Sequence, residues 1–364
     1  MGPSAMTRKI RPVWRLALLA GLVLGGAAAC ERELTSVPGG AVMAETVGSG
    51  AIAGRVLDVS GVPVPGARVS TPEGASAVTG AGGEFVLAGL PAAERLAATV
   101  TAEGYASTTA IYRVVPGATL SREIRVLRRG PRVRIDAAAG GVVAFAGGGR
   151  VTIPPNAFAG VKPGESVTVQ VTYYDPAAEG QLAAAPGDFS ATEADGTASQ
   201  LETAGMVDVF VTNAQNAQVS VAPGQQVQIS FPDRDGGAVA TWGLYRFDTS
   251  TGTWVRTGDA PPAPDGTQQA RVPSVDRPWN ADQPLITTCI TVKVEDLGGA
   301  PRANELVEVE GTNWRASGWT DSSGSVDIRV KSSSQADVSA GPAAQTITTP
   351  SASQNCTPSV TLAY

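Results

Sequence analysis

The sequence predicts an all-β protein in which an N-terminal signal segment precedes three β-sandwich domains. Three observations support this class: Gly 43 and Pro 26 supply many turns, charged residues make up only 16 %, and short runs alternate apolar and polar residues. Helical bundles need more Glu, Lys, Arg and Leu and fewer helix-breaking residues. A chain of 364 residues is expected to form about two or three domains, each with its own core.

Residues 1–29 have the features of a secretory signal. Four basic residues precede a 14-residue apolar run at 16–29, which is shorter than the roughly 20 residues of a membrane-spanning helix. The run ends in Ala27-Ala28-Ala29-Cys30, which resembles the bacterial lipobox, where the Cys thiol receives a diacylglycerol. Ala27 stands where a lipobox usually has Leu, so an ordinary signal-peptidase site that leaves a free Cys30 is the alternative.

We predict that Cys30 is lipidated and that residues 30–50 form a flexible, Gly-containing tether. The chain has 27 basic and 33 acidic residues, and removal of residues 1–29 takes away four basic ones and no acid, which leaves a net charge of −10. Such an acidic chain is not expected to bind nucleic acid.

The predicted partners are a membrane, reached through the lipid, and an envelope protein or polysaccharide. The predicted location is the cell envelope, at the periplasmic face or the outer membrane.

The segment 51–130 predicts a first small sandwich, because strands of four to six residues with period 2 alternate with Gly- and Pro-rich turns. Its later strands are expected at 95–102, 107–114 and 120–126.

The ordered motifs of this segment resemble the carboxypeptidase regulatory-like domain, a prealbumin-like sandwich. The matching pieces are Gly54-x-Val56, Asp58-x-x-Gly61-x-Pro63-x-x-Gly66-Ala67-x-Val69, Thr79-x-x-x-Gly83-x-Phe85, Gly89-Leu90-Pro91 and Ala102-x-Gly104-Tyr105. The resemblance implies that Gly and Pro fix the turns and that Phe85 and Tyr105 pack inside.

Residues 281–364 repeat the pattern of the first module. Asp58, Gly61, Pro63 and Val69 recur 238 positions later, and Thr79 and Gly83 recur 241 positions later, as expected of a second copy with a three-residue insertion. The stretch 332–353 is of low complexity and is predicted to add little core. Only 360–364 is then expected to form a last strand.

Residues 131–280 are predicted to form a larger β-sandwich. Its clearest element is a hairpin around 248–252, where Phe247 and Trp254 are expected to pair across the strands. The order of its motifs, from IPPNAF at 153–158 onward, resembles the β-domain of the cartilage intermediate layer protein family and similar bacterial surface lipoproteins over 131–364. That resemblance implies an extracellular setting and supplies no catalytic residue.

The sequence contains no His, which excludes Ser-His-Asp and Cys-His catalysis and the usual zinc hydrolases. No Gly-x-Ser-x-Gly elbow, Ser-x-x-Lys motif or phosphate loop is present. We therefore predict no enzyme activity, no catalytic residue, no cofactor and no metal. Asp233 and Asp235 have the spacing of a calcium loop but lack the later acid that closes one, and an ordinary turn is the favoured interpretation.

Trp314 and Trp319 flank a polar turn of the last module and are the candidate residues for stacking on a sugar. The alternative is that both pack inside, because the domain cores need most of the few aromatic side chains. The predicted function is a non-catalytic, lipid-anchored envelope protein whose modules act as spacer and interaction domains of an adhesion type. The alternative function is carbohydrate binding by the prealbumin-like sandwiches.

Cys289 and Cys356 are predicted to form a disulfide. Only three Cys are present, Cys30 is assigned to the lipid, and an exported chain enters an oxidising compartment. Cys289 opens the first strand of the last module and Cys356 precedes its final strand. Two unpaired thiols are the alternative.

Overall fold

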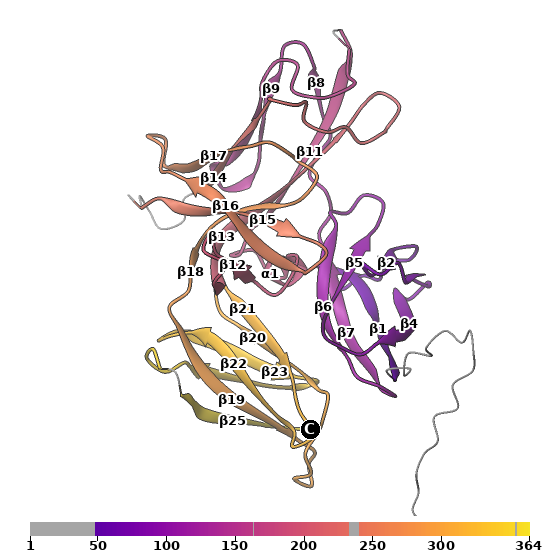
Figure 1. Cartoon of the computed structure of the whole chain (residues 1–364), viewed down its shortest axis with the longest axis vertical. Coiled ribbons are helices and arrows are strands. Elements are labelled where there is room, and N and C mark those ends of the chain that lie inside the picture. The colour runs from indigo at the N-terminus through magenta and orange to yellow at the C-terminus, as the bar shows by residue number, and fades with distance from the viewer. Residues whose placement is uncertain (1–47, 163, 233–239, 354) are drawn as a thin grey trace, which may run out of the picture. The chain divides into compact units, whose positions relative to one another are not determined.

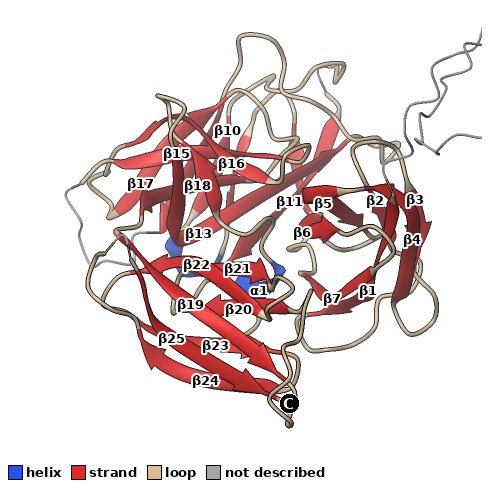
Figure 2. Cartoon of the chain, turned by 60° about the horizontal axis from the view of Figure 1, so that its bottom comes forward, coloured by secondary structure: helices blue, strands red, loops and turns tan. Residues whose placement is uncertain are grey.

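The computed structural model describes residues 48–162, 164–232, 240–353 and 355–364. Figures 1 and 2 show that this part of the chain is built from β-sheets, with very little helix. Its strands form six sheets, which pair into three sandwiches. The all-β class predicted from the sequence is therefore confirmed. The signal segment, Cys30, most of the tether and the Asp233–Gly237 turn lie outside the described residues.

The first module is a sandwich of a three-stranded and a four-stranded sheet, with the orders β4-β1-β7 and β3-β2-β5-β6. Its strands are β1 (Ser49–Asp58), β2 (Arg68–Ser70), β3 (Ser76–Val78), β4 (Glu84–Pro91), β5 (Ala93–Thr101), β6 (Thr108–Val114) and β7 (Thr119–Val126). The last three agree with the strands predicted from alternation. Phe85 and Tyr105 are buried in its core.

The middle domain packs a four-stranded sheet of order β17-β14-β10-β9 on a seven-stranded sheet of order β12-β16-β15-β18-β13-β11-β8. Its strands are β8 (Val133–Asp136), β9 (Gly141–Ala144), β10 (Arg150–Ile153), β11 (Ser166–Tyr174), β12 (Ser190–Thr192), β13 (Ala198–Thr212), β14 (Val227–Pro232), β15 (Trp242–Asp248), β16 (Thr253–Ala260), β17 (Thr267–Val272) and β18 (Trp279–Pro284). Its helices are η1 (Ala146–Gly148) and α1 (Gln181–Ala184).

The predicted hairpin is present as β15 and β16. Phe247 and Trp254 face each other across the strands, with ring centroids 5.0 Å apart in an edge-to-face arrangement. Both side chains are buried, so this aromatic pair stabilises the middle domain.

The last module repeats the topology of the first, with sheet orders β22-β19-β25 and β21-β20-β23-β24. Its strands are β19 (Thr287–Glu295), β20 (Leu306–Glu310), β21 (Arg315–Trp319), β22 (Ser325–Lys331), β23 (Gln335–Ala340), β24 (Ala343–Thr348) and β25 (Cys356–Ala363). In both modules the first strand pairs in parallel with the last, β1 with β7 and β19 with β25.

The two copies also share the turns that define the repeat. The side chain of Asp58 accepts two backbone N–H groups of its own turn, and Asp296 does the same 238 positions later. The hydroxyl of Thr79 donates to one loop carbonyl and accepts one amide, and Thr320 repeats both bonds. These positions, which the two copies share, therefore stabilise turns, as expected for Asp and Thr side chains.

One prediction for the last module is wrong. The low-complexity stretch 332–353 forms β23 and β24, and Ala336, Val338 and Ala340 on β23 are buried. The buried positions alternate, but two of the three are Ala, so small side chains hid the period of the strand. The final strand also begins earlier than predicted, at Cys356.

The disulfide between Cys289 and Cys356 is confirmed. The two residues are register partners on the parallel strands β19 and β25, and their Cα atoms are 4.2 Å apart. This separation is within the roughly 7 Å that a disulfide can bridge. The bond ties the first strand of the last module to its final strand.

Candidate functional site

The two tryptophans proposed for sugar stacking lie in different environments. Trp314 has no exposed surface, and its Nε1 donates to Ser334 Oγ at 3.2 Å. A fully buried ring cannot stack on a sugar, so the sequence hypothesis is wrong for Trp314, which fills the core of the last module. Trp319 is half-buried and packs against the core of the first module. Its ring is stacked on Tyr112, with centroids 6.3 Å apart and an interplanar angle of 26°.

Many polar contacts converge on a short segment of the middle domain, residues 181–189, which we call the junction segment. It consists of the single-turn helix α1 followed by irregular backbone in which Gly187 and Phe189 have positive φ angles. Side chains from both flanking modules bind its backbone. Because few of its own peptide groups are paired within a helix or ladder, they are available to neighbours, and buried peptide groups need such partners.

Arg315 of the last module binds three carbonyl oxygens of the junction segment. One Nη donates to Ala183 O at 3.1 Å, and the other donates to Ala185 O at 2.9 Å and to Gly187 O. The guanidinium also lies over the ring of Phe189, 5.6 Å from its centroid. Burial lowers the pKa of Arg315, and Glu308, Glu310 and Asp188 oppose that shift. The three carbonyl oxygens thus hold the cation through direct hydrogen bonds.

The first module binds the same segment from its own side. Thr108 Oγ1 donates to Ala184 O at 3.0 Å, and the amide of Gly187 donates to Thr109 O at 2.8 Å. Arg95 forms a two-point ion pair with Asp188, with N–O distances of 2.6 and 2.9 Å. Burial acts to raise the pKa of Asp188, but the hydrogen bonds and charge of Arg95 outweigh it and hold that pKa below its usual value.

Backbone conformation shows that the junction segment is shaped by its neighbours. Phe189 is fully buried and has a φ of 63°, a value that bulky residues adopt only when the surroundings enforce it. Gly187 has a φ of 76°, and a Cβ there would lie 2.8 Å from Phe247. A glycine is therefore required at this position.

The modules also share apolar packing. A cluster on one side of the seven-stranded sheet combines Leu182, Phe189 and Trp254 of the middle domain with Ala106 and Leu127 of the first module. The first and last modules touch each other through the Tyr112–Trp319 contact and through an ion pair of 2.7 Å between Arg122 and Glu308. All three modules are thus joined pairwise.

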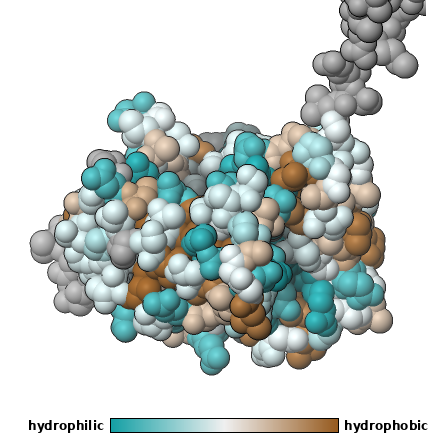
Figure 3. Space-filling model, turned by 90° about the horizontal axis from the view of Figure 1, so that it is seen from below, coloured by the Kyte–Doolittle hydropathy of each residue, from teal (hydrophilic) through white to brown (hydrophobic). Residues whose placement is uncertain are grey.

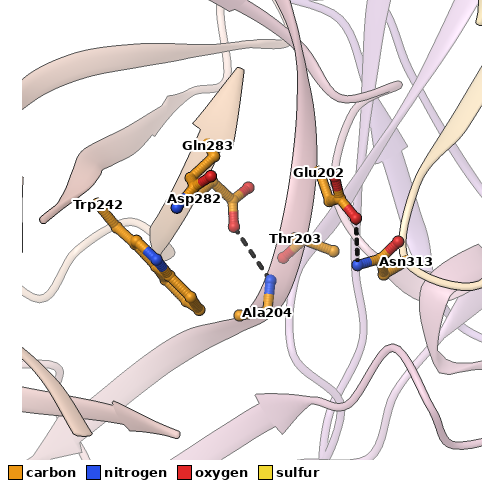
Figure 4. Close-up of a pocket in the computed structure, with 7 residues that line it drawn as sticks. All are labelled: Glu202, Thr203, Ala204, Trp242, Asp282, Gln283 and Asn313. Carbon is orange, nitrogen blue, oxygen red and sulfur yellow. Dashed lines mark hydrogen bonds between the residues drawn. The ribbon is translucent and has the colours of Figure 1, made fainter. Parts of the chain in front are cut away.

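A small pocket lies where the middle domain meets the last module (Figure 4). Its volume is about 90 Å³, and it is lined by Glu202, Thr203, Ala204, Trp242, Asp282, Gln283 and Asn313. Asp282 is fully buried, and one of its oxygens accepts the amide of Ala204 at 3.3 Å. Burial raises the pKa of Asp282 well above its usual value, because its hydrogen bonds do not replace the lost hydration.

The chemistry of this pocket is limited by its size and its partners. Glu202 accepts Asn313 Nδ2 at 2.8 Å and is paired with Lys331. Within the described part of the chain, Trp242 Nε1 is buried without a partner. A volume of this order holds about three waters, so the pocket suits small polar groups and does not admit a glycosidic linkage.

The described residues hold no group of three or more His, Cys, Asp or Glu side chains arranged to bind a metal ion. They also contain no helix with the length and apolar character of a membrane span.

The face shown in Figure 3 mixes apolar and polar residues. Within the described ranges, the large apolar side chains exposed to solvent come from separate segments. They are Val62, Val78, Val86, Val142, Ile286 and Leu297.

Sequence reasoning did not identify the junction segment, Arg315 or Asp188 as important. The side chains of the flanking modules that bind this segment are more than 75 residues away from it in sequence. The available signal was Arg315 itself, which is the one charged residue of the short strand β21 and lies between Trp314 and Trp319 in sequence.

Comparisons with known proteins agree with part of this picture. Residues 51–127 match the model of the carboxypeptidase regulatory-like domain family. A segment is 28 % identical over 224 residues to cartilage intermediate layer protein 2 of Mus musculus, a match that includes 57 % of this chain and 19 % of the mouse protein. The chain therefore spans about a fifth of that relative.

Similar solved structures include the TIE protein of Bacillus anthracis, at a TM-score of 0.21 and 12 % identity, covering 86 % of this chain and 51 % of that one. They also include the major pilin SpaD of Corynebacterium diphtheriae, at a TM-score of 0.20 and 8 % identity, covering 88 % and 98 %. TM-scores this low carry no conclusion about function.

Proposed function

We propose that this chain is a non-catalytic, lipid-anchored envelope protein whose β-sandwich modules act as spacer and interaction domains. The observation that supports this most directly is that charged side chains bind one module to another. Arg315, Arg95 and Asp188 bind neighbouring modules and leave no free nucleophile or base among them. Contacts of this kind between modules keep the modules at fixed distances from one another, and a spacer requires such fixed distances.

The disulfide supports a location outside the cytoplasm. Disulfides form and persist in oxidising compartments and are rare where thiols are kept reduced. The Cys289–Cys356 bond is therefore in keeping with an exported chain. The remaining Cys, Cys30, follows the apolar run and is the residue that would carry the lipid.

Metabolic labelling with a palmitate analogue in a bacterial host tests the anchor. The wild-type chain is expected to be labelled and to sediment with membranes, whereas Cys30→Ala should lose the label and be released. The matched control is a chain with both Cys289→Ser and Cys356→Ser, which keeps Cys30 and should stay labelled. Release of unlabelled wild-type protein would refute the anchor.

The absence of catalysis has its own test. Purified protein should release no product from panels of peptides, esters and glycosides, with or without added zinc. Turnover that follows the protein through repeated purification would refute the non-catalytic role.

A further inference from the structure

A second cavity, of about 170 Å³, lies between the first module and the middle domain, and Pro186 of the junction segment lines it. Hydroxyl groups of the first module form one wall: Thr99 and Thr101 on β5, Ser107, and Thr109 on β6. Thr99 and Thr109 are hydrogen-bonded to each other at 3.1 Å. The volume is several times the roughly 30 Å³ that one water occupies.

The lining also carries four charged residues, Arg129, Asp208, Asp276 and Arg277. Asp276 is paired with Arg246, and Arg277 donates to Thr249 Oγ1 at 2.7 Å, which leaves Arg129 and Asp208 for a ligand. The guanidinium carbon of Arg129 lies 3.5 Å from the centroid of the Phe210 ring, and its Nε is buried without a partner in the described part of the chain. Stacking on Phe210 fixes the plane of the guanidinium.

Arg129 and Asp208 influence each other electrostatically but do not pair. Burial raises the pKa of Asp208 to about 6, and the charge of Arg129 opposes that shift. Among the described residues, no ion pair within 4.0 Å and no side-chain hydrogen bond joins Asp208 or Arg129 to another group. Two half-buried charged groups that share a cavity without contact leave hydrogen-bonding capacity unused.

A hydroxyl group satisfies both charges at once, because it can accept from a guanidinium and donate to a carboxylate. Adjacent hydroxyls on a sugar ring repeat this arrangement, and the Thr and Ser wall provides further donors and acceptors. Pro186 and Pro278 add apolar surface to the cavity, and such surface can contact the C–H face of a ring.

We propose that this cavity binds one neutral sugar ring, with Arg129 and Asp208 holding adjacent hydroxyls. The site is distinct from Trp314 and Trp319 and goes beyond the spacer role, since it gives the interaction role a ligand class. An amino-acid zwitterion could also span a cation and an anion, but it would leave the hydroxyl wall of the first module without ligand partners.

The proposal is tested with the full chain, purified with its native N-terminus, by isothermal titration with glucose, galactose, mannose, N-acetylglucosamine and, as zwitterions, glycine and glutamate. At least one sugar is expected to bind. The variants Asp208→Asn and Arg129→Met are expected to weaken binding about tenfold or more, because each removes one charged hydrogen bond and keeps the side-chain volume.

Controls separate this site from others and from loss of folding. Arg271→Ala, at an exposed position on β17, and Trp319→Phe should leave sugar affinity unchanged, and circular dichroism should show that every variant is folded. Binding that is lost in Trp319→Phe, or kept in folded Asp208→Asn and Arg129→Met, would overturn the proposal. So would binding of a zwitterion but of none of the sugars, or no binding of any sugar up to its solubility limit.

Discussion

Single charged residues form many of the hydrogen bonds that join one module to another. Arg315 is the clearest example, because its guanidinium serves three carbonyl oxygens of one segment. Arg95 approaches the same segment from the first module and adds two more carbonyl contacts, to Thr251 and Gly252. Charged hydrogen bonds of this kind are stronger than neutral ones. Removal of one partner therefore costs more free energy of folding than it does for a neutral bond.

Replacement of Arg315 by Ala is expected to destabilise the chain by about 2–5 kcal/mol, since three carbonyl oxygens lose their donor in a buried setting. The free energy of unfolding in urea measures this loss. Arg315→Lys should recover only part of it, because one ammonium group cannot reproduce the fork of a guanidinium. The exposed control Arg271→Ala should stay within about 0.5 kcal/mol of wild type; an equal loss in both variants would show that Arg315 has no special role.

Asp208 predicts a pH dependence of opposite sign to that of a paired carboxylate. Its folded-state pKa of about 6 is above the ordinary value of 3.8, so the folded state holds a proton that the unfolded state has released. Stability should therefore fall as the pH rises from about 4 to about 6 and stay lower above that window.

The variant Asp208→Asn removes this titration. It is expected to be more stable than wild type at about pH 8, by roughly 1–3 kcal/mol, and to differ little near pH 3. Thermal unfolding of both proteins across this range measures the difference. A variant that is less stable than wild type at alkaline pH would mean that the ionised carboxylate is favourably bound in the fold.

Among the elements, β19 and β25 depend on the disulfide. It closes a loop of 67 residues, and a loop of this size is worth about 4 kcal/mol in the chain-entropy model. The variant Cys289→Ser/Cys356→Ser is expected to unfold at lower urea concentration by an amount of this order. Reduction of the wild type should reproduce the shift, and reductant should have no effect on the variant. An unchanged midpoint after reduction would show that the bond adds nothing to stability.

Strands with strong alternation could be predicted from the sequence, and β5, β6 and β7 lie where the pattern placed them. The repeat could be predicted as well, because Asp58, Thr79 and their counterparts form the same turns in both copies. β23 was missed because Ala carries little hydrophobic signal. The junction segment was missed for another reason. Its conformation depends on Arg315 and Arg95, which are distant in sequence, and a local sequence pattern does not predict contacts with distant residues.

At the scale of the whole molecule, the contacts between modules predict joint unfolding. Each small module has its own core, yet Trp319 of the last module packs on the core of the first, and the first module contributes to a cluster of the middle domain. Interfaces between domains often permit relative motion unless they are large and apolar. Here the apolar clusters are reinforced by Arg315 and Arg95 at the junction segment.

Scanning calorimetry of the chain with Cys30→Ser tests most directly whether the three modules form one rigid unit. A single transition is expected, with a van't Hoff enthalpy close to the calorimetric enthalpy. The double variant Arg95→Ala/Arg315→Ala should split this transition, because it removes the side chains that bind the junction segment from both sides. Three separate transitions in the wild-type protein would contradict a rigid spacer and would show that the modules unfold independently of one another.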